Sequence, residues 1–241
     1  MDLFVVTGTT RGLGGALAQH IASDPGNDLV CVARRAAAVG RSIEADLADP
    51  AAVPSIEAAL RQLIGERRYG RAVLLNNAGV VSPVGPLERV DAGELERNLR
   101  VNLVAPVLLM GAFLRATEGR AERRRIVNIS SGAGRRPIFG WGGYCTAKAG
   151  LDMASRVAAL EAQQRGQAVE VVSLAPGVID TPMQEVVRGA AAEDFVDVER
   201  FRQMKAEGVL RPAANVAADI LRLEAEGKLG AEPVADLRAM A

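Results

Sequence analysis

The chain has 241 residues, and its 29 basic side chains balance 29 acidic ones, so that the formal net charge is zero. This balance gives no electrostatic reason to expect nucleic acid or an anionic membrane as a partner. Hydrophobic residues make up 49% of the chain and charged residues 24%, as in an ordinary globular protein rather than a fibre or a disordered chain. A doubly wound parallel sheet of six to seven strands commonly uses this length, so we expect one α/β domain over residues 1–241.

Histidine and cysteine are scarce, which limits the chemistry that the chain can carry. The single histidine is His20, and the two cysteines are Cys31 and Cys145. These numbers argue against a metal site, a Ser-His triad and a disulfide framework, and they favour a reducing cytoplasm. Cys145 could be considered as a nucleophile, but it has no histidine near it in the sequence, and a small helix-packing residue is the simpler interpretation.

Two further features support a cytoplasmic expectation. The first predicted strand begins at Leu3, which leaves no room for a signal peptide ahead of it. The longest apolar run, residues 101–114, is interrupted by Asn102 and Pro106 and is too short to span a bilayer. We therefore expect no membrane as a partner.

The chain opens with the pattern of a strand, a glycine-rich turn and a helix. Leu3–Val6 is a short β-branched and aromatic run, and Gly12–Ala22 has the pattern of an amphipathic helix. Glycines in such a turn let the backbone approach a pyrophosphate at the N-terminus of the helix. The turn residues that we expect to contact a dinucleotide are Gly8, Thr10, Arg11, Gly12, Leu13 and Gly14.

The second predicted strand, Leu29–Ala33, ends in two arginines. Arg34 and Arg35 stand where dinucleotide folds that prefer NAD carry a carboxylate for the ribose hydroxyls. Together with Arg11 in the turn, either arginine could bracket a 2′-phosphate through its guanidinium fork. The alternative is that these arginines are solvated surface charges.

The middle of the chain continues the alternation of strands and helices. Strands are predicted over Ser42–Ala45 and Arg71–Leu75, and a helix is expected to begin with Asp49 as its cap and Pro50 at its first position. A long helix is predicted over 91–116. It carries Asn102 amid apolar neighbours, where a polar side chain is costly to bury without partners.

Tyr144 and Lys148 are the residues around which we expect the site to form. Ser131 follows the predicted strand Arg125–Ser130, and Tyr144 and Lys148 stand four residues apart on a helix predicted over Tyr144–Arg165. That spacing places both side chains on one helix face. A cation a few Å from a phenol lowers its pKa from the usual value near 10, which makes proton transfer near neutral pH feasible.

The last third of the chain completes the predicted sheet. A buried strand over Ala168–Leu174 leads into residues 175–181, which cross the carboxyl ends of the strands, where open α/β sheets bind ligands. Residues 181–210 have a mixed helical pattern and are the expected substrate lid. A final helix over Ala213–Glu226 and a short strand over Val234–Leu237 follow.

The motifs TGTTRGLG, NNAG, Ser131 and YCTAK occur in that order, and together they resemble the short-chain dehydrogenase/reductase family over nearly the whole chain. The resemblance implies a Rossmann fold with Asn102, Ser131, Tyr144 and Lys148 as a catalytic tetrad. Tyr144 would donate a proton to a carbonyl oxygen that Ser131 binds, and Lys148 would tune Tyr144 and hold the cofactor ribose. Asn102 would bend its helix and hold a water of the proton relay; a surface asparagine is the alternative.

The same resemblance assigns the remaining cofactor contacts. The position of Arg11 matches that of relatives that use NADP, so we expect NADP(H), with NAD(H) possible. Asn76 would mainly brace the sheet. The other expected contacts, from the adenine edge to the nicotinamide carboxamide held by Thr181, are Asp46, Leu47, Ala78, Gly79, Pro176, Gly177, Ile179, Thr181 and Met183.

Within the family, the segments GWGGYCTAK and APGVIDTPMQ are more similar to sepiapterin and benzil reductases than to acyl-carrier-protein reductases. Asp236 would correspond to the acidic residue that anchors a pterin, although the local spacing differs by about one residue. The expected substrate contacts are Ser131, Trp141, Tyr144, Gly177 and Asp236.

We therefore expect an NADPH-dependent carbonyl reductase that acts on a small ketone or diketone. An alcohol dehydrogenase, a 3-oxoacyl reductase and a catalytically idle dinucleotide-binding protein are the alternatives. The apolar character of the two long predicted helices, 91–116 and 144–165, together with the resemblance, suggests a homodimer or homotetramer.

Overall fold

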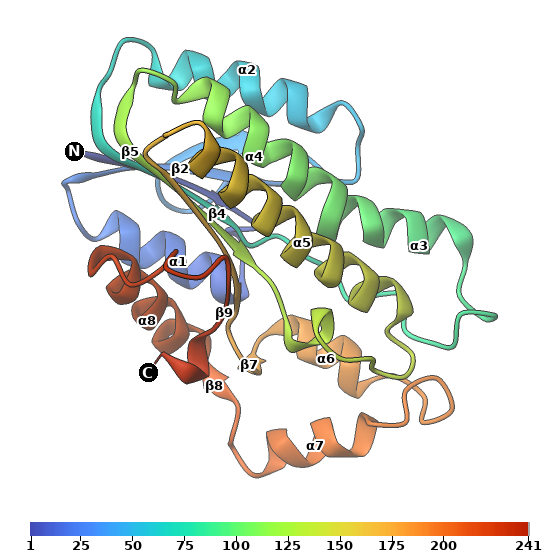
Figure 1. Ribbon diagram of the computed structural model, residues 1–241. Coiled ribbons are helices and arrows are strands. Elements are labelled where there is room, and N and C mark those ends of the chain that lie inside the picture. Colours follow the sequence, from blue (N-terminus) through green and yellow to red (C-terminus); the bar gives the residue numbers. More distant parts are fainter. Residues whose placement is uncertain (241) are drawn as a thin grey trace.

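Seven parallel strands form the central sheet of the computed structural model, which describes residues 1–240 (Figure 1). The strand order is β3-β2-β1-β4-β5-β6-β9, which confirms the predicted doubly wound parallel sheet. A separate short pair is formed by β7 (Ile179–Asp180) and β8 (Arg211–Pro212). The strands of the central sheet are β1 (Asp2–Thr7), β2 (Asn27–Ala33), β3 (Arg41–Glu44), β4 (Tyr69–Asn76), β5 (Ala121–Ile129), β6 (Val169–Ala175) and β9 (Val234–Asp236).

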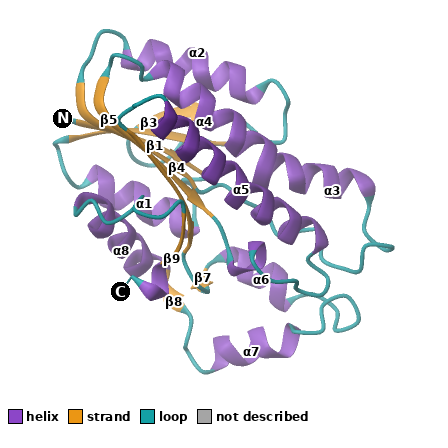
Figure 2. Ribbon diagram, viewed as in Figure 1, coloured by secondary structure: helices purple, strands orange, loops and turns teal. Residues whose placement is uncertain are grey.

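Helices cover both faces of this sheet (Figure 2). One face carries α2 (Ala52–Ile64), α4 (Ala105–Ala116) and α5 (Gly142–Gln164), and the other carries α1 (Gly12–Ala22) and α8 (Ala213–Ala225). Successive residues of β1 alternate between the two faces, because side chains of a strand point to opposite sides. Leu3 and Val5 lie in the core on the α2 side, whereas Phe4 and Val6 lie in the core on the α1 side.

The predicted long helix is interrupted in the structure. It consists of α3 (Ala92–Leu99), a π-helical segment over Arg100–Val104, and α4. Pro106 has no N–H to donate to the Asn102 carbonyl, which removes one α-helical hydrogen bond at this point. The prediction of one regular helix is therefore wrong over these five residues.

By length and composition alone, the combined run Ala92–Ala116 could cross a membrane. Half of its most apolar window is buried inside the protein, as in the core helix of a globular fold.

The helix predicted to begin at Asp49 and Pro50 begins instead at Ala52. The Asp49 carboxylate accepts a hydrogen bond of 2.8 Å from the Ala51 N–H, so it stabilises the turn before the helix rather than the helix itself.

The sheet reverses its strand order between β1 and β4, and this point determines where a ligand can bind. The chain runs outward from β1 to β3 on one side and continues from β4 to β9 on the other. Loops at the carboxyl ends of neighbouring strands then separate, which leaves a crevice. Two short helices, α6 (Pro182–Arg188) and α7 (Val198–Ala206), lie at this end of the molecule (Figure 1).

Candidate active site

A cavity of about 410 Å³ opens at the carboxyl ends of the strands. Five of the predicted site residues do not line it, namely Gly14, Arg35, Asn76, Asn102 and Asp236. The predicted residues that line it are Gly8, Thr10, Arg11, Gly12, Leu13, Arg34, Asp46, Leu47, Ala78, Gly79, Ser131, Trp141, Tyr144, Lys148, Pro176, Gly177, Ile179, Thr181 and Met183.

The glycine-rich turn has no room for larger side chains. Gly8 has a positive φ of 75°, and a Cβ added there would lie 2.9 Å from the Cα of Ala78. A Cβ on Gly14 would lie 2.2 Å from the Gly8 carbonyl oxygen, so Gly14 serves close backbone packing beneath the cavity. No side chain caps the start of α1, which leaves its first N–H groups available to an anion. These features fit a dinucleotide pyrophosphate.

The two asparagines of the NNAG loop, Asn76 and Asn77, have different surroundings. Asn76 is buried and donates hydrogen bonds to the Asn128 side chain at 2.8 Å and to the Pro106 carbonyl at 3.2 Å, so it braces the sheet rather than contacting the cavity. Asn77 lines the cavity, and its N–H donates to the Thr7 hydroxyl at 2.9 Å. Asn76 thus braces the sheet, as mainly expected, and the cofactor contact also expected of it is not possible from the cavity wall, where Asn77 lies instead.

Arginines gather at the end of the cavity beside β2. Arg11 and Arg34 line the cavity, whereas Arg35 lines a second depression with Arg11, beside α1. Within residues 1–240, no carboxylate forms an ion pair with any of these three arginines. Their charges are therefore available to a phosphate group.

Asp46, at the same end, already has two protein partners. Its carboxylate accepts hydrogen bonds from the Ala48 N–H at 3.0 Å and from Arg97 Nη2 at 3.2 Å. Burial acts to raise the pKa of Asp46, but the two hydrogen bonds and the charges of Arg97 and Arg34 together hold that pKa below its usual value. Arg97 also lines the cavity; it comes from α3, far away in the sequence, and the motifs give no signal for it.

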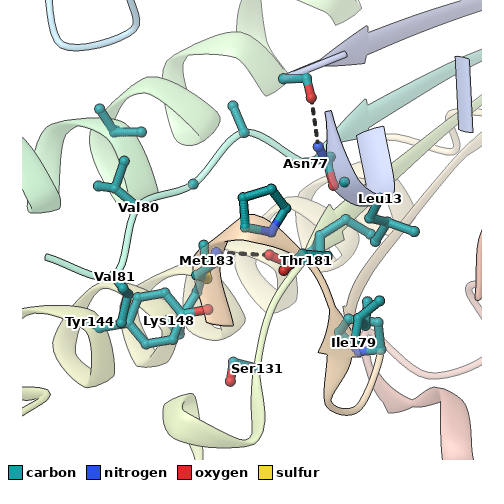
Figure 3. Close-up of a pocket in the computed structure, with 18 of the residues that line it drawn as sticks. Leu13, Asn77, Val80, Val81, Ser131, Tyr144, Lys148, Ile179, Thr181 and Met183 are labelled. Atoms are coloured by element: carbon teal, nitrogen blue, oxygen red, sulfur yellow. Dashed lines mark hydrogen bonds between the residues drawn. The ribbon is translucent and has the colours of Figure 1, made fainter. Parts of the chain in front are cut away.

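Tyr144 and Lys148 lie together on α5, and Ser131 lies on the loop that follows β5 (Figure 3). Lys148 Nζ is 5.5 Å from the centre of the Tyr144 ring and donates a hydrogen bond of 2.8 Å to the Ile129 carbonyl. Both side chains are buried, at 7% and 4% exposure. The structure thus brings the predicted proton donor, its neighbouring cation and the hydroxyl of Ser131 into one small space.

Burial, rather than the ammonium, dominates the ionisation of this pair. It raises the pKa of Tyr144 to about 12, and a hydrogen bond with Ser131 only partly opposes this. Burial also lowers the pKa of Lys148 to about 8, while the charge of Asp152 acts to raise it. The expectation that Lys148 lowers the pKa of Tyr144 is therefore not met in the protein alone, because the loss of hydration of the phenolate is the larger effect.

Asp152 is a residue of the site that the sequence patterns missed. It lies one helical turn after Lys148 and is 6% exposed. Its Oδ1 accepts hydrogen bonds of 2.6 Å from the hydroxyls of Ser130 and Ser173, and its Oδ2 accepts one of 3.3 Å from Arg135 Nε. These three hydrogen bonds satisfy the buried carboxylate, and its charge acts on the neighbouring Lys148.

Asn102 is completely buried, which excludes the surface alternative. Its side chain brackets the backbone of Val80: Nδ2 donates to the Val80 carbonyl at 2.7 Å, and Oδ1 accepts from the Val80 N–H at 3.0 Å. A Cβ built on Gly79 would lie 2.9 Å from Asn102 Oδ1 and 3.9 Å from Lys148 Nζ. Asn102 therefore fixes the loop beside Lys148, although it does not itself line the cavity.

An aromatic cluster forms the far end of the cavity. Trp141 stacks on Phe195 with ring centres 5.1 Å apart, meets Tyr144 edge-on at 5.4 Å, and packs against Phe201. Phe195 and Phe201 belong to the segment that follows α6, so this cluster holds that segment against the start of α5. Gln184 on α6 also lines the cavity; it is 8% exposed, and its Oε1 lacks a hydrogen-bond partner among residues 1–240.

Asp236 does not reach the cavity, contrary to our expectation of a substrate anchor. Its carboxylate binds the guanidinium of Arg238, at 2.9 Å from Nε and 2.6 Å from Nη2. Arg238 lines the cavity instead. The residue from the C-terminal segment that is available to a substrate is thus a cation and not a carboxylate.

Comparison with known proteins identifies relatives along most of the chain. The short chain dehydrogenase family profile matches residues 2–191. The chain is 35% identical to a benzil reductase ((S)-benzoin forming) from Bacillus cereus over 239 residues, covering 92% of this chain and 94% of the relative. It is 34% identical to the sepiapterin reductase of Meriones unguiculatus, covering 91% of this chain and 89% of the relative.

A solved structure agrees with these matches. A gluconate 5-dehydrogenase from Beutenbergia cavernae, described as putative, NAD(P)-dependent and with bound NADP, superimposes with a TM-score of 0.77 at 25% identity, covering 98% of this chain and 94% of that chain.

Proposed function

The chain belongs to the short-chain dehydrogenase family and is an NAD(P)-dependent oxidoreductase, and within that family we propose that it is an NADPH-dependent carbonyl reductase. The proposed substrate is a ketone or diketone, and the proposed proton donor is Tyr144. The observation that carries the proposal is the convergence of Tyr144, Lys148 and Ser131 between a dinucleotide cradle and an aromatic pocket.

The proposal assigns roles to three residues of the site, Tyr144, Ser131 and Lys148. The reduced nicotinamide, when bound, supplies the hydride. The Tyr144 phenol donates its proton to the substrate carbonyl oxygen, and the Ser131 hydroxyl binds the same oxygen as negative charge develops there. Lys148 stays close to Tyr144 and binds the cofactor ribose. Its pKa of about 8 leaves it mostly protonated at neutral pH.

The proton given up by Tyr144 must be replaced, and we propose that Lys148 passes it on. We propose that Asn102, which binds the Val80 backbone through two hydrogen bonds, holds a water through which the proton returns to Lys148. The charge of Asp152 favours the charged form of Lys148 against the effect of burial. Residues 181–210 act as the lid, which is attached to α5 by the stacking of Trp141 on Phe195.

The free guanidinium groups of Arg11 and Arg34 support the choice of NADPH over NADH. Both line the cavity at the end of β2, where a ribose 2′-phosphate would lie in a Rossmann fold. Neither forms an ion pair within residues 1–240, and the charge of Arg34 acts only at longer range on Asp46. A relative that prefers NAD usually carries an acidic residue at the same place.

Exposed apolar side chains support an oligomer. Val107 and Leu108 on α4 are 37% and 46% exposed, and Met153, Val157 and Leu160 on α5 are 45% to 60% exposed. We propose that these helices pair with a second copy of the chain. We also propose a cytoplasmic location, in which the free thiols of Cys31 and Cys145 persist.

Oxidation of NADPH by the purified protein on a panel of aryl and alkyl diketones tests the proposed function. We expect turnover of at least one diketone, with the product alcohol identified by chromatography. The variant that tests the role of Ser131 is Ser131→Ala, which removes the hydroxyl at the carbonyl oxygen and should lower kcat by on the order of a hundredfold. Tight NADPH binding without turnover of any carbonyl compound would instead indicate a dinucleotide-binding protein.

A further inference from the structure

Two arginines lie at the substrate end of the cavity. Arg136, on the loop between β5 and α5, and Arg238, near the C-terminus, both line it. Asp46 is the only carboxylate that lines the cavity within residues 1–240, and it lies at the opposite, adenine end in a bond with Arg97. A neutral ketone needs no such charge.

Arg238 is held in place at this end. The two nitrogens Nε and Nη2 bind the Asp236 carboxylate, while Nη1 has no hydrogen-bond partner among the described residues. The aliphatic stem lies over the loop after β6, where a Cβ built on Gly177 would be 3.5 Å from Arg238 Cδ. Arg238 is therefore an oriented guanidinium with a free edge, next to the segment expected to hold the nicotinamide.

Arg136 supplies a second, uncompensated charge. Its neighbour Arg135 is held elsewhere, because its Nε binds Asp152 and its Nη2 donates a hydrogen bond of 2.8 Å to the Ala235 carbonyl. That bond also brings the Arg136 loop next to β9, just before Arg238. Arg136 itself forms no ion pair within residues 1–240, so its charge is free to meet a ligand.

The cavity wall next to Tyr144 is apolar. Ile138, Trp141 and Phe201 line it together with Val187. A ligand that satisfies both parts of this surface has an apolar or aromatic body with an anionic group at one end.

From this arrangement we infer that the substrate is a keto acid, whose carboxylate is bound by Arg136 and Arg238 while its carbonyl lies at Tyr144. The inference rests on the proposed carbonyl reductase function and narrows its substrate class. The carbonyl carbon gains the hydride and the carbonyl oxygen gains the Tyr144 proton, which gives a hydroxy acid. The carboxylate itself is unchanged and serves only to bind and orient the molecule.

The test compares two probes with the same aryl carbonyl group, benzoylformate and its methyl ester, at saturating NADPH. We expect a kcat/KM for the acid on the order of ten- to a hundredfold above that for the ester, since a charge-assisted contact gives about this factor. Arg136→Gln and Arg238→Gln should each reduce this acid-to-ester ratio by about tenfold. Arg123→Gln, at the opposite end of β5, is the control and should keep the ratio.

A binding measurement makes the result independent of turnover. Calorimetry with mandelate and methyl mandelate in the presence of NADP should show tighter binding of the acid, and both arginine variants should remove that difference. Equal or better use and binding of the esters would overturn the inference while leaving the carbonyl reductase proposal in place. If neither probe is reduced, the calorimetric comparison alone decides, because loss of acid-selective binding in the variants supports the inference and its absence rejects it.

Discussion

The ammonium of Lys148 lies 5.5 Å from the centre of the Tyr144 ring, and both side chains are buried away from bulk water. Burial drives the two groups in opposite directions, to a pKa of about 12 for the phenol and about 8 for the ammonium. At neutral pH the pair is therefore a neutral phenol beside a cation. That is the combination that reduction requires, because the phenol must hold the proton that it donates.

Replacing Lys148 with Met should stabilise the protein at neutral pH while removing its activity. The folded-state pKa of about 8 lies below the ordinary value of 10.5, so burial of the charged form costs on the order of 3 kcal/mol below pH 8. Between these two values the unfolded chain binds more protons, and the wild type regains stability as the pH rises. Thermal unfolding should thus show a higher Tm for Lys148→Met at pH 7, and a gap that narrows toward pH 10.

Lys228→Met serves as the control for that experiment, since Lys228 is largely exposed. A Tm for Lys148→Met that is below wild type at every pH would mean that the bond from Lys148 to the Ile129 carbonyl outweighs the cost of burying its charge.

Asp152→Asn should shift the pH dependence of reduction. The Asp152 carboxylate raises the pKa of Lys148 against the effect of burial, so its removal should lower that pKa below about 8. The fall in kcat/KM with rising pH should then begin at a lower pH than in wild type, while the amide keeps acceptor oxygen for Ser130 and Ser173. An unchanged pH profile with a uniformly lower rate would show that Asp152 matters only for packing.

Arg34→Asp should move cofactor preference toward NADH. Two charge-assisted contacts to a 2′-phosphate would favour NADPH by on the order of a hundredfold in wild type, after allowance for solvent exposure. The aspartate would remove one contact, repel the phosphate and offer an acceptor to the free ribose hydroxyls. Steady-state kcat/KM for both cofactors measures the change.

Arg35→Asp is the matched comparison, because Arg35 lies in the neighbouring depression rather than in the cavity, and its effect should be smaller. Equal use of NADH and NADPH by wild type would mean that these arginines are only surface charge.

The sequence predicted the strands and helices that carry the site better than the hydrogen bonds between its side chains. Apolar runs predicted most strands of the sheet, and the spacing of four residues placed Tyr144 and Lys148 on one helix face, whereas the meeting of Ser131 with Tyr144 was implied by the family resemblance. The hydrogen-bond partners of Asp152 could not be predicted from local patterns. They are Ser130, Ser173 and Arg135, which come from other segments of the chain, and no sequence motif indicates that they lie close to Asp152.

The failed assignment of Asp236 has a similar origin. β9 ends at Asp236, and the next residues, Leu237–Ala239, form a short helical turn in which the alternation of a strand no longer applies. The carboxylate of Asp236 turns toward the Arg238 backbone N–H, at 3.0 Å, and starts a short helical turn that carries Arg238 to the cavity. The sequence shows that residue 236 is an aspartate, but it does not show that this aspartate pairs with Arg238.

Val157→Glu combined with Leu160→Glu should disrupt assembly. Both side chains are about half exposed on α5, and a carboxylate there would be buried without a partner in a paired-helix interface. We expect light scattering to show an oligomer for wild type at micromolar concentration and at least a tenfold weaker association for the variant, on the order expected for such a burial. Gln163→Glu adds the same charge at an exposed polar position of α5 and should not change the assembly; a wild-type monomer would refute the proposed pairing.

Tyr144→Phe tests the central claim most directly, because it removes the proton donor and keeps the ring that packs against Trp141. The measurement is kcat for carbonyl reduction with saturating NADPH, alongside the NADPH dissociation constant from fluorescence titration. We predict that kcat falls by at least about a thousandfold, as expected for loss of a general acid, while the dissociation constant stays within a few-fold of wild type. A Phe variant that retains most of its kcat would show that Tyr144 is not the proton donor.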